Sequence, residues 1–238
     1  MAMVHTRPWW WAAGGAVGLA LTALLVPLSV GGWAAGLAFL AVSAALVSAG
    51  LARSKADRFG AGNAVTATRS ALIGVVAALV ATSLTEPIPP LLLAALVAPA
   101  LALDAVDGWA ARRTGTVTPL GARFDMEADA FLILVLSVYD VRIVGAWVLA
   151  IGLMRYAFVA AGWLFPWLRA TVPFRYWRKV VAAACGITLA AIATGVLPSP
   201  VDVVVGVTAL ALLVESFGRD VIWLTRMNFR ARPLVTSP

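Results

Sequence analysis

The chain of 238 residues contains one cysteine and one histidine, which excludes several common kinds of site. A single thiol, Cys185, can form neither a disulfide within the chain nor a redox pair, and its apolar surroundings predict a buried side chain. Zinc sites normally recruit His or Cys. The single histidine and the single cysteine lie far in sequence from the aspartates between residues 104 and 129, which are the candidate metal ligands of this chain. A disulfide scaffold, a dithiol redox centre and a zinc site are therefore disfavoured.

Charged residues are also scarce, at 12% of the chain, while hydrophobic residues make up 62%. The mean hydropathy is +0.95, far above that of soluble domains. At roughly 20 residues per span, the length allows about eight transmembrane helices and leaves no room for a separate soluble domain. The net charge of +7 comes from basic residues clustered in loops, not from a basic domain with interleaved aromatics, so nucleic-acid binding is not expected. The predicted fold class is an all-α, polytopic membrane helix bundle.

The apolar runs divide into eight predicted spans separated by turn-forming or charged segments. A short charged segment after the second span, Arg53 to Gly60, is typical of a juxtamembrane helix lying in the interface. Asp140 and Arg142 are expected to mark the loop after the fifth span. The predicted spans are residues 9–28, 33–51, 64–84, 91–112, 121–139, 144–163, 180–196 and 201–224.

The distribution of Lys and Arg predicts the orientation of the bundle. With both termini in the cytoplasm, every basic loop cluster lies on the cytoplasmic side and only Arg142 lies outside. The turn between the fourth and fifth spans then faces the cytoplasm, and the host membrane is expected to be the plasma membrane.

Four aspartates stand in the otherwise apolar region from residue 104 to residue 129. On one helix, Asp104 and Asp107 are at i and i+3 and share a face; on the next, Asp125 and Asp129 are at i and i+4. Intramembrane acids are costly, so four that converge need cations to offset their repulsion. Oxygen-only ligands favour magnesium, manganese or calcium.

The same region carries a family signature, DxxDGxxAR(x8)GxxxDxxxD, with every fixed position and spacing matched. In this respect the chain resembles the CDP-alcohol phosphotransferases, integral membrane enzymes with a six-helix core. The resemblance covers about residues 53–226, which divides the chain into an N-terminal helix pair, 1–52, and a catalytic core with a basic tail, 53–238. The matching residues are Asp104, Asp107, Gly108, Ala111, Arg112, Gly121, Asp125 and Asp129.

The resemblance implies transfer of a substituted phosphoryl group, commonly phosphatidyl, from a CDP-linked lipid to a small hydroxyl acceptor, with release of CMP. Two divalent ions, Mg²⁺ or Mn²⁺, would be held by the four aspartates, and Asp129 would also serve as general base. The CDP moiety would lie against Gly108, Ala111, Arg112 and Gly121. Homodimers are frequent among such relatives, and phospholipid biosynthesis is the pathway implied.

The acceptor site is predicted from basic residues on the cytoplasmic side. An anionic acceptor would suit a cluster of Arg155, Arg175, Arg178 and Lys179, although positive-inside topology alone accounts for the three loop residues. Arg155 stands inside a span, where it needs either a helix partner or a cavity. Ala130 follows the last motif acid, where relatives that use glycerophosphate or inositol phosphate often carry a basic residue, so neither acceptor is favoured.

Two other functions use the same acids differently. A divalent-cation transporter would use them as a transit site but has no need of Gly108, Arg112 or Gly121 at these spacings. A catalytically silent membrane scaffold does not require an intact acid set. Metal-dependent release of CMP distinguishes the enzyme from both.

Overall fold

The computed structural model describes the backbone of residues 7–54, 61–114, 119–170, 172–173 and 175–231. Side chains are described for residues 8–53, 65–104 and 121–229, apart from 171 and 174. This part of the chain is almost entirely helical and contains no strand. The expected segment 55–60 and the turn 115–118 lie outside the described residues. The helices are α1 (Arg7–Leu25), α2 (Val30–Ser54), α3 (Ala61–Ser83), α4 (Pro90–Thr114), α5 (Pro119–Val144), α6 (Leu149–Leu164), α7 (Tyr176–Ala193) and α8 (Ser199–Ala231), with short 3₁₀ turns η2 (Ala146–Val148) and η3 (Pro166–Arg169).

The all-α membrane bundle expected from composition is thus confirmed. Within the described residues, six helices are long and apolar enough to cross a membrane: α1, α2, α3, α6, α7 and α8. In α4 the stretch Pro90–Asp104, whose side chains are described, is apolar and shorter than these spans. The chain is an integral membrane protein.

One boundary prediction was wrong. Asp140 and Arg142 do not lie in a loop, because α5 continues through them to Val144. Asp140 is fully buried, so its side chain faces the bundle and does not end the helix. The helix stops at Gly145, whose φ of 95° lies in the region that favours glycine.

Helix α3 is the centre of the N-terminal half. In its apolar segment 67% of the residues are buried, against 22% to 33% in the other five spans. Four helices surround it, α1, α2, α4 and α5, and the run Val75–Val80 is buried without interruption. A helix that is hydrophobic all round is expected at such a position.

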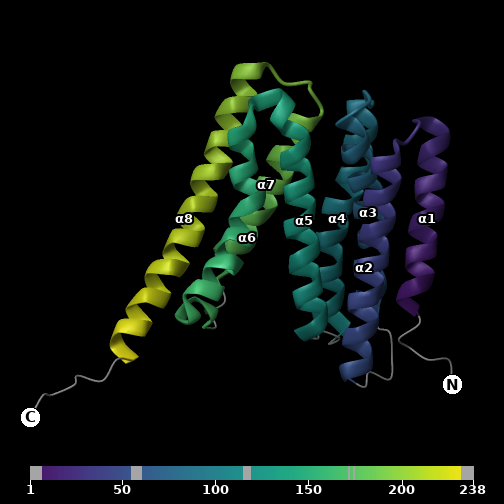
Figure 1. Cartoon of the computed structure of the whole chain (residues 1–238). Coiled ribbons are helices and arrows are strands. Elements are labelled where there is room, and N and C mark those ends of the chain that lie inside the picture. The colour runs from purple at the N-terminus through teal and green to yellow at the C-terminus, as the bar shows by residue number, and fades with distance from the viewer. Residues whose placement is uncertain (1–6, 55–60, 115–118, 171, 174, 232–238) are drawn as a thin grey trace, which may run out of the picture.

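Helix α5 joins this half to the other, because it packs against α3 and also against α6 and α7. Helix α8 in turn packs on α7 (Figure 1). The approach of α6 to α5 is close: a Cβ at Gly152 would lie 2.6 Å from the Cα of Leu134. In Figure 1, α4 ends and α5 begins at the same end of the bundle as the start of α1 and the end of α8.

Candidate active site

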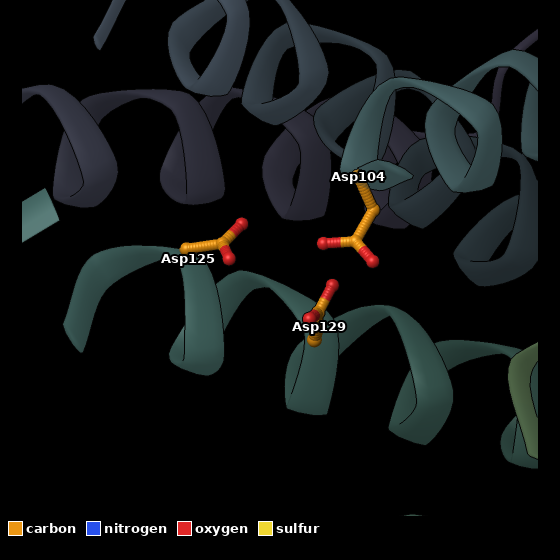
Figure 2. Close-up of side chains that lie close together, drawn as sticks. All are labelled: Asp104, Asp125 and Asp129. Atoms are coloured by element: carbon orange, nitrogen blue, oxygen red, sulfur yellow. The ribbon is translucent and has the colours of Figure 1, made fainter. Parts of the chain in front are cut away.

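Three aspartates from two helices converge near that end of the bundle. Asp104 comes from α4, and Asp125 and Asp129 come from successive turns of α5 (Figure 2). One carboxylate oxygen of each lies within 4.8 Å of the others. The three side chains are partly buried, with exposed fractions of 19%, 29% and 31%. Asp125 and Asp129 thus share one face of α5, as their spacing predicted, and this face is turned toward Asp104 of α4.

A buried arginine from α3 lies among these carboxylates. Arg69 is fully buried, and its Nη1 donates to Oδ1 of Asp104 at 3.2 Å and to Oδ1 of Asp125 at 2.5 Å. Its Nη2 contacts Oδ1 of Asp129. One guanidinium thus bridges Oδ1 atoms of all three acids that could together hold a metal ion.

The sequence prediction assigned no role to Arg69. The sequence did indicate a role for Arg69, because a lone arginine inside an apolar span must meet an acid or a cavity. Choosing among the acids requires knowing that α3 packs against both α4 and α5, which the chain order does not reveal.

The donor set fits a hard divalent cation. Three carboxylates meet with no nitrogen or sulfur ligand among the described residues of the cluster, as magnesium and manganese prefer. Against one guanidinium they leave the described site with excess negative charge. The other predicted motif residues on α4, Asp107, Gly108, Ala111 and Arg112, lie outside the described side chains.

Gly121 stands one turn before Asp125 on α5. It lines a pocket together with Phe124 of α5 and with Thr66 and Ser70 of α3. The remaining walls come from α1 and α2, through residues such as Leu40. The two N-terminal helices therefore contribute to a mainly apolar pocket next to the helix turns that carry the acids.

The four basic residues predicted for the acceptor lie on α6, on α7 and just before it. Arg155 of α6 pairs with Glu127 of α5: Nε lies 3.3 Å from Oε2, and Nη2 contacts Oε1. Arg178 pairs with the buried Asp220 of α8 at 3.1 Å. Lys179 is exposed and close enough for its charge to act on Asp125, while Arg175 precedes the first turn of α7.

The helical bundle and its acid cluster define a membrane protein with a polar site between α3, α4 and α5. A family model for CDP-alcohol phosphatidyltransferase matches residues 59–215, about two thirds of the chain. The chain belongs to this family, and the resemblance read from the signature is confirmed. Searches of curated proteins and of solved structures find no match.

Membership sets the class of reaction. The family transfers a phosphoryl group from a CDP-alcohol donor to an alcohol acceptor within a membrane, and the protein is a transferase of this type. The match begins at residue 59, so α1 and α2 precede it.

Proposed function

We propose that the protein transfers a phosphatidyl-type group from a CDP-linked lipid to a small alcohol, releasing CMP, as a step of phospholipid synthesis. The observation that carries this proposal is the convergence of Asp104, Asp125 and Asp129 from α4 and α5 in a chain of this family. Three carboxylates beside an apolar pocket suit a donor that has a diphosphate at one end and hydrocarbon at the other.

In the proposed reaction the acceptor hydroxyl oxygen forms a bond to the lipid-bearing phosphorus. The bond from that phosphorus to the oxygen of CMP breaks, and CMP leaves with the electron pair. Asp129 takes the proton of the hydroxyl. Magnesium or manganese bound by Asp104, Asp107, Asp125 and Asp129, two ions in our proposal, would neutralise the diphosphate and stabilise charge on the attacking and leaving oxygens.

The neighbouring residues bind and orient the substrates in this proposal. Gly108, Ala111 and Gly121 carry almost no side chain and leave a flat surface for the cytidine, and the planar fork of Arg112 binds a phosphate. Arg155, Arg175, Arg178 and Lys179 form the acceptor site. We infer that this end of the bundle faces the cytoplasm and that the host membrane is the plasma membrane. The positive-inside rule supports this orientation, because the basic connection before α7 and the end of α8 lie at this end.

The test is a comparison of two Asp→Asn variants on the same helix. Asp129→Asn should retain binding of CDP-diacylglycerol but lose transfer, because the amide does not take the proton. Asp140→Asn removes a buried acid near the other end of α5 and should release CMP at the wild-type rate. CMP is measured by chromatography with Mn²⁺ and a panel of acceptor alcohols. Undiminished transfer by Asp129→Asn would show that another group takes the proton.

A further inference from the structure

We propose that Arg69 is a built-in counter-cation of the carboxylate site. Its guanidinium takes the place of a divalent ion while no metal is bound, and it turns to the diphosphate of the donor once metal occupies the acids. The second half of this inference rests on the proposed function, whereas the first half rests on the geometry of the site alone.

The first support is the combination of burial and contacts. The Arg69 side chain has no exposed surface, and it contacts Asp104, Asp125 and Asp129 together. A buried guanidinium is stable only with anionic partners, and clustered carboxylates are stable only with cations. Each group therefore supplies what the other needs in the metal-free protein.

The second support is that the guanidinium and a metal ion compete for the same three carboxylates. Arg69 contacts Oδ1 of each of the three aspartates. These three residues are also the ones whose oxygens lie close enough together to bind one ion. Two cations held by one set of carboxylates repel each other strongly at low dielectric constant. Metal binding must therefore include the displacement of Arg69 from at least part of this set.

Charge balance indicates where the guanidinium goes. Four aspartates and two divalent ions sum to zero charge, so the metal-loaded acids no longer need the charge of Arg69. The diphosphate of a CDP-linked lipid is anionic, and a guanidinium binds phosphate oxygens through its planar fork. Arg69 is thus expected to weaken metal binding and to strengthen donor binding.

This pair of opposite effects gives a sharp test. Wild type, Arg69→Met and Arg69→Lys are purified in detergent, and Mn²⁺ binding is measured by electron paramagnetic resonance of the free ion. Binding of a short-chain CDP-diacylglycerol is then measured by calorimetry at saturating Mn²⁺ without acceptor. Arg69→Met should bind Mn²⁺ at least about tenfold more tightly and the CDP-lipid about tenfold more weakly, since each effect corresponds to one charge-assisted interaction.

The control is Arg142→Met, the same substitution near the opposite end of α5, where the side chain is exposed and lies over the ring of Tyr139. It should change neither affinity. If Arg69→Met does not fold, Arg69→Lys carries the test, because the shorter lysine side chain has one compact ammonium in place of the planar fork, and it should shift both affinities in the same directions. Weaker binding of both Mn²⁺ and CDP-lipid, or unchanged Mn²⁺ affinity, would overturn the proposal.

The outcome also separates this inference from the proposed function. Tighter Mn²⁺ binding by Arg69→Met, combined with no CMP release by the wild type, would refute the proposed function and uphold Arg69 as counter-cation. CMP release by the wild type with weaker Mn²⁺ binding by Arg69→Met would uphold the proposed function and overturn the role of Arg69.

Discussion

The pair formed by Arg155 and Glu127 allows the proposed acceptor site to be tested quantitatively. On our proposal that Arg155 faces a water-filled acceptor site, the two side chains, which are 25% and 55% exposed, form a solvated ion pair with an attraction of about 0.2–1 kcal/mol. A charge-assisted hydrogen bond from Arg155 to an acceptor phosphate contributes about 1.5–3 kcal/mol. An anionic acceptor therefore competes successfully with Glu127 for the guanidinium.

Two substitutions are expected to act in opposite directions. Arg155→Gln should raise the acceptor KM on the order of tenfold and leave the KM of the CDP-lipid unchanged. Tenfold corresponds to about 1.4 kcal/mol, which lies within the difference between the energy of the hydrogen bond to the acceptor and that of the ion pair with Glu127. Glu127→Gln should lower the acceptor KM by up to about fivefold, because Arg155 no longer has to leave a partner. The assay is CMP release at varied concentrations of a phosphorylated polyol.

The acceptor role of Arg155 is refuted if both variants leave the acceptor KM unchanged and lose a similar small amount of thermal stability. Arg155 and Glu127 would then be a structural pair between α5 and α6. An equal rise in the KM of the acceptor and in the KM of the CDP-lipid would likewise indicate a structural role. Efficient use of an uncharged alcohol by the wild type would refute the proposal that the four basic residues bind an anionic acceptor.

Two further predictions concern stability, measured as thermal unfolding in detergent. Gly152→Ala should destabilise the protein by about 1–3 kcal/mol, because its Cβ would lie 2.6 Å from the backbone of Leu134. The control is Gly14→Ala, whose Cβ would have no atom within 4 Å and which should have little effect. Equal unfolding midpoints for the two variants would contradict the close approach at Gly152. Asp140→Asn should raise the midpoint, since both carboxylate oxygens are buried without a hydrogen-bond partner among the described residues and a neutral amide is less costly to bury. A clear fall in the midpoint would mean that the charge of Asp140 is compensated.

The class of fold and the acids of the site could be predicted from the sequence because both depend on local patterns. Apolar runs of span length predict the helices, and the spacing of Asp125 and Asp129 fixes their common face whatever surrounds them. The match of the family model to residues 59–215 confirms the family that the signature indicated.

The contacts between helices could not be predicted in the same way. Arg69 reaches Asp104 and Asp125 across 35 and 56 residues of sequence, and only the packing of α3 between its neighbours brings them together. The partner of Arg155 depends on the close approach of α6 to α5 at Gly152. The end of α5 was misplaced because charge is a poor guide to a helix terminus when the charged side chain is buried, as that of Asp140 is.

The most direct test of the central claim is the stoichiometry of transfer by the purified wild-type protein. CDP-diacylglycerol and an acceptor alcohol are incubated with Mn²⁺ or with EDTA, and CMP and the lipid product are quantified together by mass spectrometry. The proposed function predicts equal amounts of CMP and of the acceptor-linked phospholipid with Mn²⁺, and neither with EDTA. Formation of neither product with any acceptor, from protein that binds Mn²⁺, would contradict it.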